Sequence, residues 1–331
     1  AAYNQLFAVV VGEGGSQALD AAAGGIAQDV AATATSGVAG LRVLNNLYNL
    51  ATNGSRPAVF EGMVELAART KSVAVLVSVV PRLVAMANEW GVDAATKAVL
   101  ALRAAFDGAQ LGSEAYAVEL AYLEAVGASG AHAAELAGSA VVRFANISAV
   151  CDVDALAGLA SVQELHKAGK LGVAGEVLEQ LLGSNYQQWQ EYAKANEQKL
   201  QELGVDVGKA GDKMRLLTLA SIAADRLGSD VPFAEIAAAI DVDIEDVEVW
   251  IIDVVRAGLV QGKMNQVMCT LVPTRSTYRT FGDDQWRVLQ SRLHQWKESL
   301  GALQPVIHNA KLLAEQQAQQ AGGQAHVTIK E

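Results

Sequence analysis

The sequence is poor in aromatic residues and in proline. Aromatic side chains make up 5% of the 331 residues although 51% of them are hydrophobic, and only 5 residues are proline. The apolar mass is therefore mostly Ala, Val and Leu. Alanine costs no side-chain entropy in a helix and lets neighbouring backbones approach, whereas strands favour aromatic and β-branched residues. This composition predicts a chain made almost entirely of packed helices.

Cysteine is equally scarce. Cys151 and Cys269 are too few and too far apart to crosslink a chain of this length, which indicates a reducing, cytoplasmic compartment. The chain starts without a secretory signal pattern, and because residues 1–3 contain no Met, we expect some N-terminal sequence to be missing. Its longest apolar run, residues 73–80, is too short to cross a bilayer. We therefore expect no membrane partner.

Basic residues are also few. The chain has 25 Lys and Arg and 36 Asp and Glu, which gives a formal net charge of -11. Proteins bind nucleic acids chiefly by neutralising phosphates with Lys and Arg. We therefore do not expect RNA or DNA to bind over the whole surface, although the net charge leaves room for a local basic patch or for contact through larger partners.

Helical spacing of apolar residues is what the sequence does contain. From about residue 17 to residue 203 this spacing is interrupted every 12 to 20 residues by Gly, Asn, Asp or Pro. The pattern predicts stacked helical hairpins in a solenoid-like array. The expected helices cover 41–51, 60–67, 76–90, 95–106, 115–126, 133–144, 153–168, 173–182 and 186–203, and a loop follows over 204–211.

The pattern changes at residue 212. Three short amphipathic helices, 213–223, 233–240 and 244–257, precede two strand-like runs, 259–263 and 267–272, around the turn Met264-Asn265-Gln266. Three helices followed by a two-stranded ribbon is the order of a winged helix. We therefore predict an all-α chain with a small β-ribbon.

The last predicted helix has an unbroken heptad seam, because apolar residues recur at alternating intervals of three and four residues. Such a narrow, long seam should supercoil against other helices. Pro305 is expected to kink this helix or split it. The expected interface residues are Trp286, Leu289, Leu293, Trp296, Leu300, Leu303 and Ile307, with Ala310 continuing the spacing.

These patterns divide the chain into four parts. We expect the helical array over 1–211, the winged helix over 212–282, the bundling helix over 283–320 and a disordered tail over 321–331.

The third helix of the predicted winged helix argues against DNA reading. A winged helix that reads DNA inserts this helix into the major groove, but residues 243–257 hold five acids and one arginine, a net charge of -4. A protein-facing role is the better interpretation. At the edge of the wing, Lys263, Arg275 and Arg279 are candidates for contact with RNA or a partner, or for pairing with neighbouring acids.

No active site is predicted. The apolar run 6–11 and the following Gly12-Glu13-Gly14-Gly15 imitate a dinucleotide-binding turn, but Gln17 stands where the third Gly or Ala is needed. The acids between 241 and 248 lack the Gly and the bidentate Glu of a calcium loop. The five histidines have no metal-ligand spacing. We expect no catalytic residues, no cofactor, no metal and no small-molecule substrate.

Several stretches of the C-terminal third resemble the PCI domain, which is shared by subunits of the proteasome lid, the COP9 signalosome and eukaryotic translation initiation factor 3. The sharpest stretch is similar to the subunit m family of the initiation factor, and the weakest likeness is in the Ala- and Gly-rich residues 1–160. The stretches are Lys213-Met214-Arg215-Leu216-Leu217-Thr218, Asp246-Val247-Glu248, residues 251–260, and above all Ser276-Thr277-Tyr278-Arg279-Thr280-Phe281-Gly282 with Gln285-Trp286 and Trp296-Lys297.

The resemblance implies a non-catalytic subunit. In this family the helical repeats, from about residue 130 here, and the winged helix form one PCI unit, winged helices pair edge to edge, and C-terminal helices join a shared bundle. The implied partners are other PCI and MPN subunits, and the small ribosomal subunit and mRNA through the complex. The alternatives are a PCI subunit of the signalosome or the proteasome lid, or a winged-helix regulator that binds nucleic acid.

Overall fold

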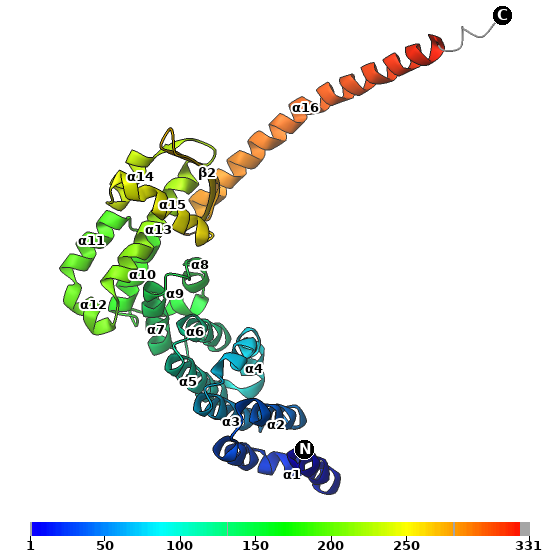
Figure 1. Ribbon diagram of the computed structural model, residues 1–331, viewed down its shortest axis with the longest axis vertical. Helices are drawn as coiled ribbons and strands as arrows, with labels where there is room; N and C mark the ends of the chain where they lie inside the picture. Colours follow the sequence, from blue (N-terminus) through cyan, green and yellow to red (C-terminus); the bar gives the residue numbers. More distant parts are fainter. Residues whose placement is uncertain (1, 131, 281, 325–331) are drawn as a thin grey trace, which may run out of the picture. The chain divides into compact units, whose positions relative to one another are not determined.

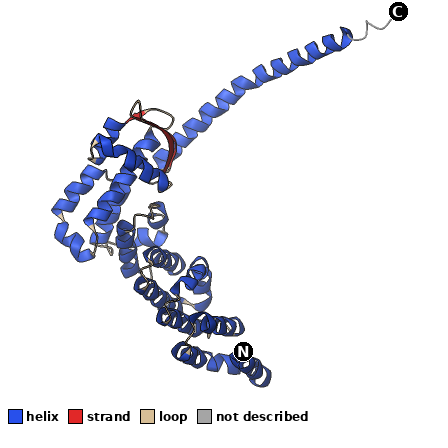
Figure 2. Ribbon diagram, viewed as in Figure 1, coloured by secondary structure: helices blue, strands red, loops and turns tan. Residues whose placement is uncertain are grey.

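The computed structural model describes residues 2–130, 132–280 and 282–324, and it divides the chain into two compact units, residues 1–279 and residues 280–331. The first unit is a succession of helices that ends in a small sheet, and the second contains one long helix (Figures 1 and 2). The predicted fold class, an all-α chain with a small winged-helix ribbon, is confirmed.

The array begins with helices that pack on one another in succession along the chain. Its first helix contacts the second and third, and packing then passes from α3 to α5, from α5 to α6 and from α6 to α7 (Figure 1). The bounds are α1 Ala2–Thr33, α2 Gly37–Leu50, α3 Arg56–Arg69, η1 Val73–Arg82, α4 Leu83–Trp90, α5 Val92–Gly108, α6 Gly112–Val126, α7 Ala133–Asn146, α8 Asp154–Ala157, α9 Ala160–Lys167, α10 Val173–Gly183, α11 Tyr186–Ala195 and α12 Glu197–Leu203.

Small residues permit this close packing. At the crossing of α3 and α1, a Cβ added to Gly62 would lie 3.0 Å from the Cβ of Ala27 and 3.1 Å from its carbonyl oxygen. At the crossing of α2 and α3, a Cβ on Gly40 would lie 2.5 Å from a methyl carbon of Leu66. The abundance of Ala and Gly therefore has the packing role that the composition predicts.

The expected single helix over 76–90 is wrong. Residues 73–82 form a 3₁₀ helix, η1, and α4 begins only at Leu83, because Pro81 lacks the N–H that an α-helix interior needs. By length and composition alone, residues 73–90 qualify as a segment that crosses a membrane, although core helices of helical proteins also meet that test. Buried Val73, Leu76 and Leu83 join the core of the array.

Two more expected helices are broken, at Gly158 and at Asn196, and the expected loop over 204–211 is mostly helix. Asp206 caps the helix that replaces it, since its carboxylate accepts hydrogen bonds from the backbone N–H groups of Gly208 and Lys209 at 3.0 and 3.2 Å. This helix, α13, spans Val207–Asp225 and therefore crosses the expected domain boundary at residue 211.

The winged helix packs three helices against a three-stranded sheet in the order β1-β3-β2. The predicted ribbon lies further along the chain, with its second strand at 270–276 instead of 267–272. The short first strand was not expected. The bounds are α13 as above, β1 Val231–Pro232, α14 Phe233–Ile240, η2 Ile244–Asp246, α15 Val247–Arg256, β2 Val260–Asn265 and β3 Thr270–Ser276.

The second unit contains α16, which spans Asp283–Gln324. It is a single 42-residue helix that includes Pro305, so the expected split at this proline is wrong. Of the expected disordered tail, residues 321–324 are helical, and residues 325–331 lie outside the described residues. The glycine-rich run that imitates a dinucleotide-binding turn lies inside α1.

Candidate protein-docking surfaces

Helix α16 presents its heptad seam to solvent. All seven predicted seam residues are exposed, from 38% for Leu289 to 66% for Ile307, and both tryptophans, Trp286 and Trp296, are more than half exposed. Soluble chains rarely leave so large a contiguous apolar surface uncovered unless it binds a partner. The seam is therefore a candidate docking surface.

The residues least suited to a helix lie off the seam of α16. When Trp286 is assigned to heptad position a, Gly301 falls at position b and Pro305 at position f, both on the outer side. A Cβ added to Gly301 would meet open space. The seam consequently keeps its spacing through both residues.

Helix α15 of the winged helix also leaves apolar side chains uncovered. Its inner side, with Val247 and Val254 fully buried, packs into the core. Its outer side carries Val249, Ile252 and Val255, each between 44% and 57% exposed. Acids accompany these apolar residues. Glu248 and Asp253 belong to α15, where Arg256 Nη1 lies 3.3 Å from Asp253 Oδ1. Glu245 and Asp246 precede the helix in η2.

The tip of the wing adds apolar residues to this region. The side chain of Asn265 accepts hydrogen bonds from the backbone N–H groups of Val267 and Met268, at 3.1 and 3.2 Å, and so forms the turn. Val267 is 91% exposed as a result. Gln266 Nε2 donates to Glu248 Oε2 at 3.0 Å and ties the turn to α15. An apolar surface with an acidic rim is suited to protein contact and poorly suited to phosphates.

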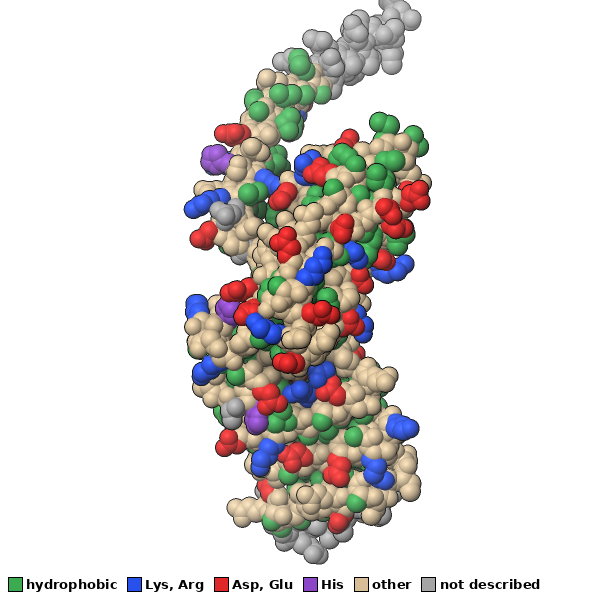
Figure 3. All heavy atoms as spheres, turned by 90° about the vertical axis from the view of Figure 1, so that its left-hand side faces the viewer, with side chains coloured by type: hydrophobic (Ala, Val, Ile, Leu, Met, Phe, Trp, Pro, Cys, Tyr) green, Lys and Arg blue, Asp and Glu red, His purple; other side chains and the backbone are tan. Residues whose placement is uncertain are grey.

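The three predicted basic contact residues do not share one surface. Lys263 on β2 and Arg275 on β3 are exposed. Arg279 instead points inward, where its Nη1 donates to the carbonyl oxygen of Ser184 at 2.6 Å and burial lowers its pKa to about 10. Arg279 therefore lies apart from the exposed pair at the wing edge, and it fastens the segment after β3 to the end of α10. On the face drawn in Figure 3, basic and acidic side chains are intermixed.

A buried lysine joins the array to the winged helix. Lys213 on α13 has no exposed surface, and its ammonium group donates hydrogen bonds to the carbonyl oxygen of Phe144 and, at 2.6 Å, to that of Val150. The same nitrogen lies 3.7 Å from the centroid of the Phe144 ring. Burial lowers the pKa of Lys213 from its ordinary 10.5 to about 8. The carbonyl groups of the last turn of a helix lack donors within the helix, and Lys213 supplies one to Phe144 at the C-terminal end of α7.

A second buried charge holds α5, α6 and α7 together. Glu119 is fully buried and lies 3.0 Å from the Nε atoms of both Arg103 and Arg143, while the hydroxyl of Ser139 donates to it at 2.7 Å. Burial raises the pKa of Glu119, against the opposing effects of the hydroxyl and the two arginines. The residues come from three helices, so sequence spacing alone did not reveal them.

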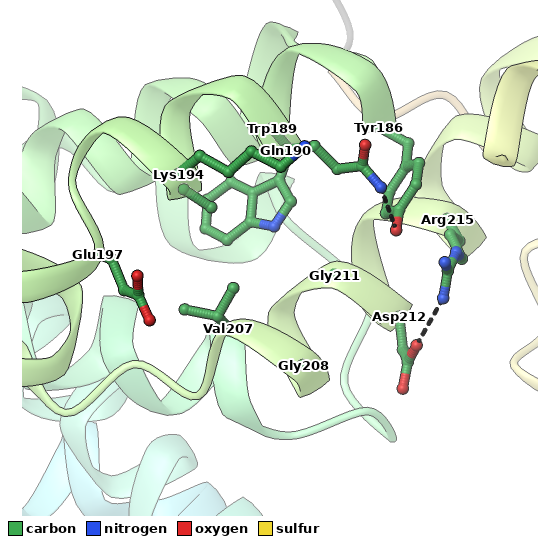
Figure 4. Close-up of a pocket in the computed structure, with 11 residues that line it drawn as sticks. Tyr186, Trp189, Gln190, Lys194, Glu197, Val207, Gly208, Gly211, Asp212 and Arg215 are labelled. Carbon is green, nitrogen blue, oxygen red and sulfur yellow. Dashed lines mark hydrogen bonds and ion pairs between the residues drawn. The ribbon is translucent and has the colours of Figure 1, made fainter.

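A cavity of about 450 Å³ lies between α11 and the start of α13 (Figure 4). Four of its polar side chains form pairs: Gln190 Nε2 donates to the hydroxyl of Tyr186 at 2.8 Å, and Arg215 Nη1 lies 3.2 Å from Asp212 Oδ1. Arg215 also stacks over the Tyr186 ring at 4.5 Å. The first two contacts are each within one helix, and the stacking of Arg215 on Tyr186 joins α13 to α11. The cavity offers no pairing of a nucleophile with a base among the residues that line it. Within 2–130, 132–280 and 282–324, no group of three or more His, Cys, Asp or Glu is placed to hold a metal ion.

Comparison with known proteins finds two families along the chain. The family described as PCI domain matches residues 193–274, and the family described as eIF3 subunit M, C-terminal helix, matches residues 279–307. The second match begins at Arg279 and covers the exposed seam up to Ile307.

Curated relatives agree with these matches. Proteins named eukaryotic translation initiation factor 3 subunit M from Aspergillus oryzae and Aspergillus terreus are 33% and 31% identical over 78% and 82% of this chain. A protein of the same name from Phaeosphaeria nodorum is 48% identical over 34% of the chain. The chain spans 58% and 61% of the length of the two Aspergillus relatives and 26% of the third.

Proposed function

This chain is a PCI-domain protein similar to subunit M of eukaryotic translation initiation factor 3, and from that premise we propose that it is a non-catalytic scaffold subunit of such a complex. In this proposal it assembles in the cytoplasm with other PCI and MPN subunits. Through the complex it supports recruitment to the small ribosomal subunit and mRNA during initiation.

The exposed seam of α16 is the observation that carries the proposal. A heptad seam becomes stable only when a second helix covers it, because its apolar residues otherwise remain in water. The family match over residues 279–307 covers this segment. The acidic and apolar outer side of α15 provides a second surface for protein contact. We propose three domains: the helical array, the winged helix and α16. The boundary between the array and the winged helix then lies before α13, which begins at Val207.

The direct test is to charge the seam. Replacing Leu293 and Leu300 by Glu should release the chain from its native partners and leave its helix content unchanged. Burial of one Leu is worth about 2 kcal/mol, so the pair should weaken binding by on the order of several hundredfold. Affinity purification followed by mass spectrometry measures the loss and identifies the companions.

A matched control uses the neighbouring outer positions. His294→Glu with Gly301→Glu adds the same charges one residue further along the same helix and should leave the complex intact. If the seam variant and the native chain recover the same partners in equal amounts, the seam is not the docking surface. Companions from the signalosome or the proteasome lid would instead support those alternative complexes.

A nucleic-acid regulator is the second candidate, and the wing gives it its only specific support among the described residues. Lys263 and Arg275 are exposed there. It predicts salt-sensitive duplex binding by the full chain near 100 mM salt, roughly the range where phosphate contacts are strong. We expect no such binding, because residues 243–257, which include α15, carry a net charge of -4 and would be placed against the groove.

A further inference from the structure

The residues that flank the seam of α16 are basic or neutral. In a coiled coil, positions e and g lie beside the apolar seam and set the choice of partner. With Trp286 at position a, the flanking positions from the first to the last seam residue hold no acid, and one more lysine follows. In order they are Gln290, Arg292, Lys297, Ser299, Gln304, Val306 and then Lys311.

This charge distribution runs against that of the whole chain, which has a net charge of -11. The acids of the same stretch, Glu298 and Glu315, fall at the outer positions f and b. Asp283 stands one turn before the seam, at the helix N-terminus, where a negative charge is favoured by the helix dipole. Between the first and last seam residues, Arg292 and Lys297 therefore flank the seam, whereas the one acid in that interval, Glu298, lies on the outer side.

The flanking cations are available to a partner. Arg292, Lys297 and Lys311 are all exposed, and none of them takes part in an ion pair or hydrogen bond recorded for the described residues. Apolar seams buried between helices bring flanking charges of the two helices close to each other, so three unpaired cations favour acids opposite them.

A second copy of this chain is a poor occupant. In a parallel pair, a residue at g faces the residue five positions later, at e, on the other helix. Arg292 would then face Lys297 of the second copy, and the contact would occur twice. In an antiparallel pair the flanking positions between Trp286 and Ile307 would bring cations only against cations or neutral residues, since this stretch of the flanks contains no acid. The one acid at a flanking position of the described helix, Asp283, lies a turn before the seam and could meet only its far end.

We propose that the seam of α16 selects a helix of a different chain whose own apolar seam is flanked by Asp and Glu, and that it disfavours self-association. This inference rests on the proposed scaffold function for the existence of such a partner. It adds the chemistry of that partner, which the seam alone does not specify.

The test measures selectivity with two synthetic helical probes. Both carry residues 283–315 of this chain, one with Glu and the other with Lys at positions 290, 292, 297, 304 and 311. Glu and Lys have similar helix propensities, so the probes differ mainly in flanking charge. Binding of each labelled probe to the full chain is followed by fluorescence anisotropy. The Glu probe should bind at least about tenfold more tightly at low salt, and the ratio should shrink near 1 M salt, where the Debye length is about 3 Å.

Two chain variants complete the test. Arg292→Glu with Lys297→Glu should reverse the preference between the probes, whereas Glu298→Lys, at an outer position, should leave it unchanged. In sedimentation, the native chain should associate with the reversed variant more tightly than with itself. Equal binding of both probes, or a native self-association tighter than the Glu-probe complex, would overturn the inference. Selective probes combined with absence of initiation-factor companions would instead refute the proposed function and leave the selectivity standing.

Discussion

The buried ammonium group of Lys213 makes the stability of the chain depend on pH in a predictable direction. Its pKa is about 8 in the folded chain and 10.5 when the residue is in water. Below pH 8 the lysine is protonated in both states. Between these values the unfolded state holds the proton and the folded state does not, so the unfolded state binds more protons and stability rises with pH.

The size of this effect follows from the shift. One pKa unit corresponds to 1.36 kcal/mol, so a shift of about 2.5 units gives a rise of about 3 kcal/mol across the interval. Because the side chain is fully buried, solvent does not weaken the effect. Lys213→Met removes the titrating group, but it also removes the donor to the carbonyl oxygens of Phe144 and Val150. At pH 7 the loss of these hydrogen bonds destabilises the variant, whereas the removal of a buried charge stabilises it. The free energy of unfolding of the variant should therefore differ from that of the native chain by only about 1 to 2 kcal/mol.

The assay is urea unfolding of both chains at pH 7, 8, 9 and 10, followed by circular dichroism. Other groups that titrate in this range are common to both chains and cancel in the difference, apart from Cys151, whose pKa is raised by burial and lowered by the charge of Lys213. The native chain should gain stability relative to Lys213→Met as the pH rises from 8 to 10. Lys209 is on the exposed side of the same helix, so the free energy of unfolding of Lys209→Met should depend on pH as that of the native chain does. If the native chain and Lys213→Met show the same pH dependence, the assignment of a low pKa to Lys213 is wrong.

Two further perturbations test the packing of the array. Glu119→Gln should destabilise the chain by about 3 kcal/mol, because the two arginines that face the carboxylate lose their counter-charge; an unchanged urea midpoint would contradict the role of this buried network. Gly62→Val should cost about 1 to 3 kcal/mol by thermal unfolding, because its side chain would press on the backbone of Ala27, whereas Gly108→Val, whose new Cβ meets open space, should have a much smaller effect.

The seam and the order of helices could be predicted from the sequence because both depend on spacing along one helix. Trp286 and Leu293 lie on the same side of α16 whatever the rest of the chain does. The 3₁₀ segment could not be predicted from apolar spacing, because that spacing continues from residue 76 to residue 90. Pro81 is the residue that indicates the interruption of the α-helix. The short strand β1 was missed because it depends on a partner 40 residues away in sequence, with Val231 opposite Leu271.

The buried charges were missed because sequence spacing does not give the direction of a side chain at a junction. Arg279 follows an exposed ribbon, and only the fold shows that it turns toward Ser184. For Lys213 a signal did exist, since it stands four and seven residues before the buried Leu217 and Ala220 and thus shares their side of α13. A lysine on the apolar side of a helix predicts a buried partner, which here is a pair of carbonyl groups.

Pro305 and Gly301 are placed so that they determine how α16 bends. Proline at position i clashes with the carbonyl group of residue i−4, which here is Gly301, and leaves that carbonyl without its helical donor. A helix at such a point bends away from the proline, so the proline lies on the convex side. Because Pro305 lies opposite the seam, the concave side of any bend is the seam itself. The helix is thus suited to curve around the partner that covers it, and a straight helix with the same apolar residues would lack that curvature.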